Sequence, residues 1–311
     1  MYIKRLLLIV VFLGLVGGGL FAYMVYDSFF LPNTRFNNEE AFVYVSSEAE
    51  FAQVKDMLEP LLEDLESFEA VAKRKQYMNN VRPGKFRLTK GMNNNEIVNA
   101  LRIGNIPVKV SFNNQETLPL LAGRIASQIE ADSLSLLNAM TDSAFLKEKG
   151  LSPEAALALY LPNSYELYWN TGAEKFRDRM LEEYNRFWNA ERQKKAEKIG
   201  LSPMQVTALA SIVHKETSKV EERPRVAGVY LNRLRLKMLL QADPTVIYAI
   251  KKESGNYDTV IKRVLYRDLA LDSPYNTYKY PGIPPGPIAM PDISAIEAVL
   301  NAEKHKYLYF V

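Results

Sequence analysis

An uncharged and mostly apolar run extends from Leu6 to Tyr26, directly after Lys4 and Arg5. At ~1.5 Å per residue, a helix of this length spans roughly the ~30 Å hydrocarbon core of a bilayer. The pattern predicts a transmembrane helix over residues 6–26, and a cleaved signal peptide is the alternative. Lys4 and Arg5 place a short tip, residues 1–5, in the cytoplasm, so the rest of the chain is expected outside it.

Residues 31–40 are mostly polar, and a linker away from the membrane is predicted over residues 27–40. Beyond it, the pattern predicts strands at 41–45 and 85–88 and two helical segments. Apolar residues recur at helical spacing over 51–75, where Pro60 divides the segment, and a helix over 96–102 begins after Asn93–Asn95. Residues 41–107 are therefore expected to form a small α+β module, followed by a strand at 108–112.

Helical patterns dominate after Leu118, with candidates at 118–131, 133–140, 142–149 and 173–198. The last carries an aromatic stripe, from Phe176 to Trp188, which favours a core face over a binding surface. The expected fold class is α+β: one N-terminal transmembrane helix, the small module, and a larger, mainly helical α+β domain over 108–311.

The amino-acid composition limits the kinds of partner and of metal or cofactor site that the chain is expected to have. The 311 residues include 39 basic and 36 acidic side chains, and this even balance argues against nucleic acid as the main partner. There is no cysteine, and the only histidines are His214 and His305, whereas zinc sites normally use several such ligands. We therefore expect no metal and no cofactor.

The most informative segment begins with a helix that Ser202 caps and Pro203 opens. Glu216 lies four residues after Ile212 and seven after Leu209, so it falls on the apolar face at the end of this helix. Burial and the helix C-terminus both disfavour its charge, which suits a general acid. The alternative is a structural carboxylate paired with Arg223 or Arg233.

Two further helices follow, at 225–237 after Pro224 and from Asp243-Pro244 to Ile250. Asp243 is expected to cap the second, and capping is favoured over catalysis. The remaining polar residues of this region suit hydrogen bonds to a polar ligand such as a sugar: Asn232, Gln241 and Thr245.

Residues 273–292 form a tyrosine-rich run that leads into a loop rich in proline and glycine. Tyr275, Tyr278 and Tyr280 offer rings for sugar faces and hydroxyls for hydrogen bonds. The prolines stiffen the loop, which suits either a cleft wall or a surface loop.

The runs ASIVHKET, ERPRVAGVYLNRL, LQADPTVIYAI and SPYNTYKYPGIPPGPI, in this order and followed by YLYFV, resemble the endolytic murein transglycosylases (the MltG or YceG-like family). VRPGKFRL and GMNNNEIVNAL are similar to the LysM-like subdomain of that family. The resemblance covers nearly all of the chain. It implies a LysM-like subdomain over 41–107 and a YceG-like catalytic domain over 108–311.

The resemblance implies that Glu216 is the catalytic glutamate. Family members often carry a second glutamate two positions earlier, where this chain has His214, which makes that position look dispensable. Pro162-Asn163 replaces a usual Pro-Asp, and the family usually continues past the YLYFV run, whereas this sequence stops at Val311. The resemblance also places substrate-binding groups of the cleft at Asn232, Gln241, Asp243, Thr245, Tyr275, Asn276 and Thr277.

The implied reaction is endolytic cleavage of the β-1,4 bond between N-acetylmuramic acid and N-acetylglucosamine, with Glu216 as acid and then base and a 1,6-anhydro end as product. The implied partners are peptidoglycan strands, the cytoplasmic (inner) membrane and the peptidoglycan synthases beside nascent strands. Two rivals stay open. One is a hydrolase in which Asp243, Glu221 or Glu222 is a second carboxylate. The other is a non-catalytic wall-binding scaffold.

Overall fold

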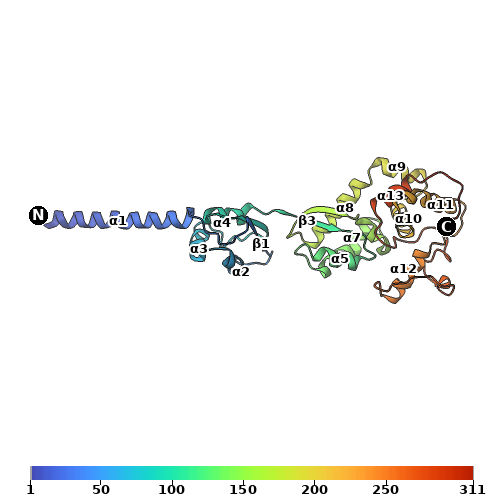
Figure 1. Cartoon of the computed structure of the whole chain (residues 1–311), viewed down its shortest axis with the longest axis horizontal. Helices are drawn as coiled ribbons and strands as arrows, with labels where there is room; N and C mark the ends of the chain where they lie inside the picture. The colour runs from blue at the N-terminus through green and yellow to red at the C-terminus, as the bar shows by residue number, and fades with distance from the viewer. Residues whose placement is uncertain (1, 311) are drawn as a thin grey trace. The chain divides into compact units, whose positions relative to one another are not determined.

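The computed structural model describes residues 2–310, so Met1 of the expected cytoplasmic tip and Val311 of the expected catalytic domain lie outside the described residues. The chain divides into two compact units, Met1–Val108 with Glu166–Asn170, and Lys109–Tyr165 with Thr171–Val311. Helices predominate in both, with short strands, which confirms the expected α+β class (Figure 1).

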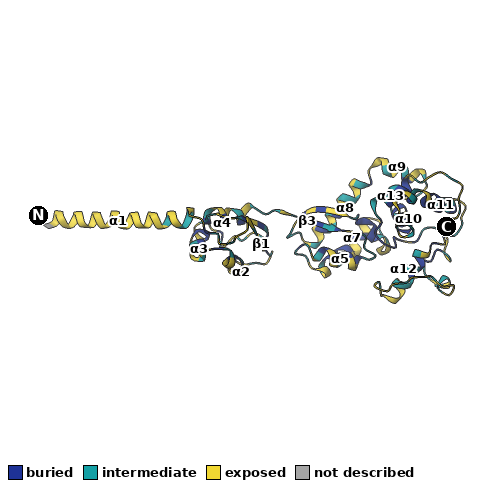
Figure 2. Ribbon diagram, viewed as in Figure 1, coloured by how far each residue is buried: buried dark blue, intermediate teal, exposed yellow. Residues whose placement is uncertain are grey.

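An apolar helix, α1 (Tyr2–Phe30), opens the first unit and is longer than the predicted span of 6–26. The stretch Ile3–Phe30 has a mean hydropathy of 2.5 and is long and apolar enough to cross a membrane, which suits either an anchor or a signal sequence. Its side chains are exposed along most of its length (Figure 2). Near the end of this helix, the side-chain amide of Asn94 donates a hydrogen bond of 2.8 Å to the Ser28 carbonyl. This bond connects the helix to the rest of the first unit.

A two-stranded antiparallel sheet lies at the centre of the rest of the first unit. Strand β1 (Glu40–Val45) pairs with β2 (Gly84–Thr89), and Val43 lies opposite Phe86 in the buried face. Three helices pack around it: α2 (Phe51–Leu58), α3 (Leu65–Arg74) and α4 (Asn94–Ile103).

The breaks between these helices follow from local sequence. Pro60 lies in a 3₁₀ turn, Glu59–Leu61, which separates α2 from α3 as predicted. Asn93 and Glu96 form a reciprocal capping box at the start of α4, which satisfies two backbone N–H groups.

The second unit begins with several short elements. Strands β3 (Pro107–Phe112) and β4 (Asn163–Tyr168) form the second two-stranded sheet. The helices here are α5 (Leu118–Ala126), α6 (Ser133–Met140) and α7 (Ser143–Glu148), with a 3₁₀ segment at Pro153–Leu159.

The single helix predicted over 173–198 is wrong, because the structure has two helices, α8 (Ala173–Phe187) and α9 (Ala190–Lys198). Asn189 ends the run: its side chain accepts a hydrogen bond from the Arg192 N–H over 3.0 Å and so starts a new helix. The aromatic stripe is core, as favoured from sequence, since Phe176 and Trp188 are buried.

The remaining helices build the core of the second unit around α10 (Pro203–Glu216). Ser202 and Gln205 form a capping box at its start, and eight consecutive residues, Val206–Val213, are buried. It packs against α11 (Arg223–Arg235), α12 (Asp243–Ser254) and α13 (Ile293–Leu300) (Figure 1). Two 3₁₀ turns complete the unit, at Val220–Glu222 and Asp268–Ala270.

Candidate active site

Glu216 is the last residue of α10, because Thr217 adopts an extended conformation (φ −137°, ψ 134°) and stops the helix. One carboxyl oxygen, Oε2, is buried and accepts no hydrogen bond from the described residues. The carboxyl also interacts by a hydrogen bond with the Tyr230 hydroxyl. A buried oxygen without a hydrogen-bond partner costs more when the carboxyl is charged, and a proton removes the charge.

The pKa of Glu216 is raised above its ordinary value, chiefly by burial. The hydrogen bond with Tyr230 opposes this rise, whereas the negative charge of Asp243 adds to it. The end of the helix macrodipole disfavours the anion in the same way. The carboxyl of Glu216 therefore keeps its proton to a higher pH than an ordinary glutamate does.

Glu216 opens into a cavity of about 330 Å³ within the second unit. Its walls come from α10, α11, the start of α12, the tyrosine-rich run and the C-terminal segment. The lining residues are Glu216, Val229, Tyr230, Arg233, Leu240, Gln241, Asp243, Tyr278, Leu308, Tyr309 and Phe310. Of the expected substrate-binding residues, the cavity brings Gln241 and Asp243 together with Glu216.

Asp243 does not cap α12, which corrects the sequence-based expectation. Ala242 is the N-cap, and Asp243 is the first residue of the helix. Its side chain instead accepts a hydrogen bond of 2.6 Å from the Tyr278 hydroxyl, which comes from a loop 35 residues away in sequence. Asp243 thus faces the Glu216 cavity, where the N-terminus of α12 favours its charge.

Gln241 has a left-handed backbone conformation (φ 52°), which is uncommon for a residue other than glycine. Contacts on both sides hold it there. Its N–H donates to the Thr277 carbonyl over 3.0 Å, and its amide oxygen accepts from Arg233 over 3.3 Å. Such a conformation persists only when the surroundings fix it, and here it directs Gln241 into the cavity.

Thr245 and Thr277 are buried beside this turn and form a closed ring of hydrogen bonds around Ala242. The Ala242 N–H donates to Thr277 Oγ1 over 3.0 Å, and Thr245 Oγ1 donates to the Ala242 carbonyl over 2.7 Å. The two hydroxyls are 2.8 Å apart, so Thr277 donates to Thr245. These two residues fix the turn and do not line the cavity.

Asn276 and Tyr275 also lie away from the Glu216 cavity. The buried amide of Asn276 donates to the carbonyls of Leu269 (2.9 Å) and Leu271 (2.8 Å), which shapes the tyrosine-rich run. Tyr275 is 1% exposed and packs on Tyr248, with ring centroids 4.8 Å apart.

Asn232, the remaining predicted residue, holds the C-terminal segment. Its amide nitrogen donates to the carbonyls of His305 (2.9 Å) and Tyr307 (3.0 Å). The nearby Gly228 leaves room for this segment, because a Cβ atom there would meet the Glu303 carbonyl oxygen at 2.5 Å.

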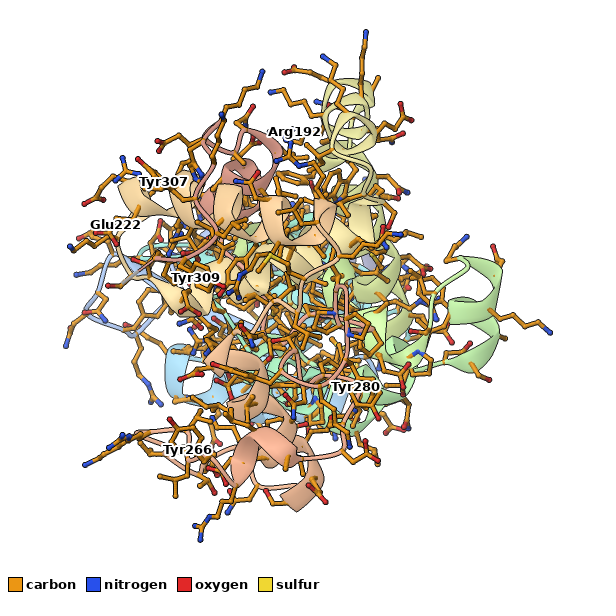
Figure 3. All side chains as sticks on the ribbon, turned by 90° about the vertical axis from the view of Figure 1, so that its right-hand side faces the viewer. Arg192, Glu222, Tyr266, Tyr280, Tyr307 and Tyr309 are labelled. Carbon is orange, nitrogen blue, oxygen red and sulfur yellow. The ribbon has the colours of Figure 1, made fainter. Side chains whose placement is uncertain are left out.

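Sequence reasoning gave Arg233 a role only as a partner for Glu216. In the structure, its guanidinium instead donates to the carbonyls of Leu308 (2.8 Å) and Leu240 (2.6 Å) and lies 4.7 Å from the Tyr309 ring centroid. It therefore joins the C-terminal wall of the cavity to the turn before α12. Figure 3 labels Tyr309 well apart from Tyr266 and Tyr280.

Arg223 also has another partner, because it lies 3.2 Å from the Asp292 carboxylate. In the part of the chain that is described, no ion pair links Arg223 or Arg233 to Glu216. The structure therefore does not support the alternative in which Glu216 is a structural carboxylate paired with one of these arginines. His214 Nδ1 lies 3.2 Å from Asp292 as well, and burial lowers the pKa of its imidazole.

The other candidate carboxylates lie outside the cavity lining. Glu222 accepts from Thr217 Oγ1 and from Lys219, each over 2.9 Å, and Glu221 is exposed. Within residues 2–310, no group of three or more His, Asp or Glu side chains is arranged to hold a metal ion. Sequence reasoning did not single out the cavity residues Tyr230, Leu308, Tyr309 and Phe310, because no spacing rule connects the C-terminal segment to α11.

Comparison with protein families gives a match to the YceG-like family over residues 43–311. The chain is 31% identical to a protein of Bacillus subtilis (strain 168) named endolytic murein transglycosylase, over 73% of this chain and 66% of that protein. It is 28% identical to a protein of the same name from Streptococcus pneumoniae (strain D39), over 97% of this chain and 59% of that protein. The chain thus spans less than two thirds of the length of these relatives.

Among solved structures, the chain is similar to a YceG-like protein of Listeria monocytogenes, with a TM-score of 0.58 and 29% sequence identity. The match covers 88% of this chain and 94% of that one.

Proposed function

Because the chain belongs to the YceG-like family, we propose that it is an endolytic peptidoglycan lytic transglycosylase with Glu216 as its catalytic residue. The observation that carries the proposal is the half-buried carboxyl of Glu216, whose pKa is raised, at the wall of a polar cavity. The matches to proteins named endolytic murein transglycosylase support the same reaction class.

In the proposed reaction, Glu216 protonates the glycosidic oxygen between N-acetylmuramic acid and N-acetylglucosamine. As this bond breaks, the C6 hydroxyl of the same muramic acid attacks C1, and the Glu216 carboxylate takes the hydroxyl proton. The product ends in a 1,6-anhydro sugar, and Glu216 regains its proton. Because the nucleophile belongs to the substrate, the step is intramolecular and needs no positioned water.

The other polar groups of the cavity suit the charge that develops in this reaction. Asp243 carries a carboxylate that favours an oxocarbenium-like transition state, and Gln241 offers an amide for sugar hydroxyls. Asn232, Thr245, Asn276 and Thr277 act here as positioning residues, since each holds a segment that forms or adjoins the cavity wall.

A hydrolase with two carboxylates is the second candidate, and one observation favours it: Asp243 lines the same cavity as Glu216. In that reaction Asp243 would orient a water molecule or attack C1 itself, and the product would be a reducing end. A non-catalytic wall-binding scaffold is the third reading, and it leaves the raised pKa of Glu216 without a use.

We further propose that α1 is an uncleaved anchor in the cytoplasmic membrane, with Lys4 and Arg5 on the cytoplasmic side. The second unit then lies outside the cytoplasm, near nascent strands and the synthases that make them. The remainder of the first unit would act as the LysM-like subdomain of the family and hold the glycan strand.

Mass spectrometry of muropeptides tests the proposal. The full chain in detergent is incubated with purified glycan strands, and the matched variants are Glu216→Gln and, as control, Glu221→Gln. Wild type and control should release 1,6-anhydro ends, whereas Glu216→Gln should release none while it keeps its fold. Reducing ends would instead establish the hydrolase, and equal digestion by Glu216→Gln would remove Glu216 from the reaction.

A further inference from the structure

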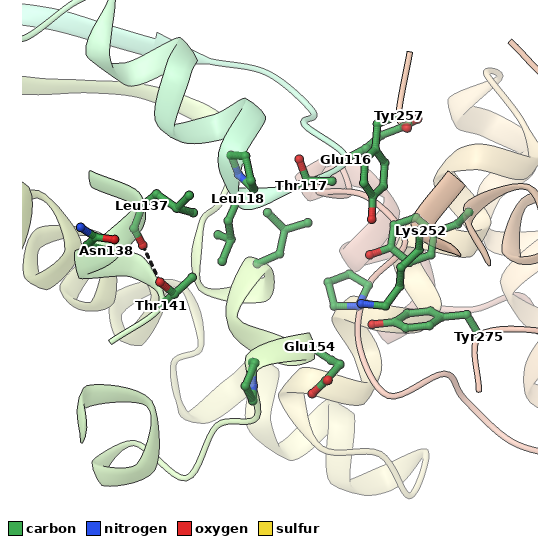
Figure 4. Close-up of a pocket in the computed structure, with 15 residues that line it drawn as sticks. Glu116, Thr117, Leu118, Leu137, Asn138, Thr141, Glu154, Lys252, Tyr257 and Tyr275 are labelled. Carbon is green, nitrogen blue, oxygen red and sulfur yellow. Dashed lines mark hydrogen bonds between the residues drawn. The ribbon is translucent and has the colours of Figure 1, made fainter. Parts of the chain in front are cut away.

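A second cavity, of about 420 Å³, lies within the second unit and shares no lining residue with the Glu216 cavity. Three segments enclose it: the start of α5, the end of α6 with the 3₁₀ segment, and α12 with the tyrosine-rich run (Figure 4). No role in the proposed reaction accounts for this cavity.

Three tyrosines form one wall, and the ring of one of them, Tyr275, is closed to a ligand. Tyr248 packs against Tyr275 at 4.8 Å and against Tyr257 at 6.0 Å between centroids, and its hydroxyl is linked by hydrogen bonds to the hydroxyls of both. Because Tyr275 is only 1% exposed, its ring is closed to a stacked sugar. This wall therefore favours a polar ligand.

Two side chains of opposite charge line the same cavity. Lys252 and Glu154 are both exposed, and neither forms an ion pair with another residue in the described range 2–310. Glu116, also in the lining, differs, because Lys215 (2.7 Å) and Lys251 (2.8 Å) neutralise it. The cavity thus presents the ammonium of Lys252, which lies 5.5 Å from the Tyr275 ring centroid, and the carboxylate of Glu154.

Apolar residues also line the cavity. Leu118, Leu137 and Leu157 contribute to it, and Leu157 is 5% exposed. An apolar lining with a few placed polar groups is typical of a site for a small ligand. Its charges suit a ligand with a carboxylate for Lys252 and an ammonium for Glu154, and with small apolar groups for the leucines.

We propose that this cavity binds a peptide stem of peptidoglycan, a short peptide with free carboxylates and the ammonium of a diamino acid. The inference rests on the proposed function, since it assumes that peptidoglycan is the substrate. It adds a recognition site for the peptide that is separate from the site of bond cleavage.

The two cavities lie along the same helix, α12. Asp243 lines the Glu216 cavity and Lys252 lines the second one, nine positions later in the same helix. At ~1.5 Å per residue this is about 13 Å along the axis, and nine steps of about 100° place the two side chains on opposite faces of the helix. An extended peptide of four residues spans about 13 Å, so a stem near Glu216 must also use the length of its link to the sugar to pass α12 and reach the second cavity.

The tyrosine-rich run repeats this arrangement, because Tyr278 lines the Glu216 cavity and Tyr275 lines the second one. Both elements thus contribute to both cavities. Occupation of the second cavity by the stem fixes the register of the strand, and so it selects which glycosidic bond lies at Glu216.

Two charge-removing variants test the proposal, Lys252→Gln and Glu154→Gln, with Glu253→Gln as the matched control because Glu253 is exposed on the same helix and does not line the cavity. The substrates are glycan strands with peptide stems and the same strands after an amidase has removed the stems. Each test variant should lower kcat/KM about five-fold on stem-bearing strands and leave it unchanged on stripped strands. The control should match wild type on both.

Direct binding gives a readout that does not depend on turnover. A synthetic stem of L-alanine, γ-linked D-glutamate, L-lysine and D-alanine is titrated into wild-type protein and the variants by calorimetry. We expect binding to wild type and to Glu253→Gln, and weaker binding to Lys252→Gln and Glu154→Gln. Equal binding by all, or binding of a neutral chitin oligosaccharide in place of the stem, overturns the proposal.

The experiments distinguish a failure of the proposed stem site from a failure of the proposed function. If the wild type cleaves strands and Glu216→Gln does not, but the Lys252 and Glu154 variants behave as wild type, the stem site is wrong and the enzyme assignment stands. If Glu216→Gln digests strands as well as wild type does, the proposed function fails, and the calorimetric titration still decides whether the cavity binds the stem.

Discussion

The Tyr278 hydroxyl donates a hydrogen bond of 2.6 Å to Oδ1 of Asp243. This contact joins the tyrosine-rich run to the first turn of α12 and holds a carboxylate in the cavity that contains Glu216. Burial is the chief cause of the raised pKa of Glu216, and the charge of Asp243 adds to that rise, so the position of one carboxyl affects the pKa of the other.

The first prediction is a shift in pH dependence. Asp243→Asn removes the negative charge that raises the pKa of Glu216, so that pKa should fall. A general acid works only while protonated, and the alkaline limb of the kcat/KM profile reports its pKa in the free enzyme. We therefore expect this limb to move to lower pH in Asp243→Asn, as measured by release of anhydro ends across a pH series.

Tyr278→Phe provides a milder form of the same test, because it keeps the charge of Asp243 and removes only its hydrogen bond. Tyr280→Phe is the matched control: Tyr280 belongs to the same run, but its hydroxyl bonds to Asp272 and it does not line the cavity. A profile that is unchanged in Asp243→Asn would refute the electrostatic link between the two carboxyls.

The second prediction concerns stability. Below about pH 4.5, the ordinary pKa of glutamate, Glu216 is protonated in both the folded and the unfolded chain. Its folded pKa is raised, so as pH increases the unfolded chain ionises first, and the free energy of unfolding falls until pH passes the folded pKa. Glu216→Gln removes this loss, which amounts to about 1.4 kcal/mol for each unit of pKa difference.

Chemical denaturation of Glu216→Gln and wild type at about pH 4, 6 and 8 measures this effect. The variant should gain stability relative to wild type as pH rises and then level off. Glu221→Gln, which replaces an exposed carboxylate, should follow wild type at every pH. A Glu216→Gln variant that loses stability with rising pH would indicate a structural ion pair in place of a protonated acid.

The third prediction addresses the hydrogen-bond ring around Ala242. Thr245→Val and Thr277→Val keep the shape of the side chain and each break the ring, which should cost about 1–3 kcal/mol per substitution. Thr277→Val should cost more, because it also leaves the buried Ala242 N–H without its acceptor.

The double variant tests whether the two hydroxyls interact with each other or form independent hydrogen bonds. Its cost should be smaller than the sum of the single costs, because either substitution already breaks the bond between the two hydroxyls. Urea denaturation of all four proteins measures the coupling. Strictly additive costs would mean that the two hydroxyls do not interact.

These sites show which features of the fold and of the cavity could be predicted from the sequence. The apolar spacing of α10 placed Glu216 on the buried face, because helical periodicity is local and strong. The helix pattern wrongly predicted Asp243 as the cap of α12, because its hydrogen-bond partner, Tyr278, lies in an irregular loop far along the chain. It also merged α8 and α9, since one capping side chain at Asn189 outweighed a continuous helical pattern.

The C-terminal wall was beyond prediction for a related reason. Residues 303–310 form no helix or strand, so their sequence carries no periodic signal. Their position depends on Asn232 and Arg233, which bind backbone carbonyls of the segment. Backbone carbonyls are present at every residue, so no sequence pattern indicates which ones these side chains bind.

The final prediction tests this wall through Gly228, in α11. Glycine inside a helix is normally less stable than alanine by about 0.5–1 kcal/mol, so Gly→Ala usually stabilises. At position 228, however, a Cβ atom would lie 2.5 Å from the Glu303 carbonyl oxygen and 2.6 Å from Nε2 of His305. Gly228→Ala should therefore destabilise the protein and push the C-terminal segment away from α11.

Gly123→Ala is the matched control, because Gly123 lies inside α5 and a Cβ atom there meets nothing within 4 Å. It should stabilise the protein by about 0.5–1 kcal/mol. In Gly228→Ala, hydrogen exchange of residues 303–310 should accelerate, and KM for glycan strands should rise because Leu308, Tyr309 and Phe310 no longer close the Glu216 cavity. Faster exchange with an unchanged KM would show that this wall does not contact the substrate.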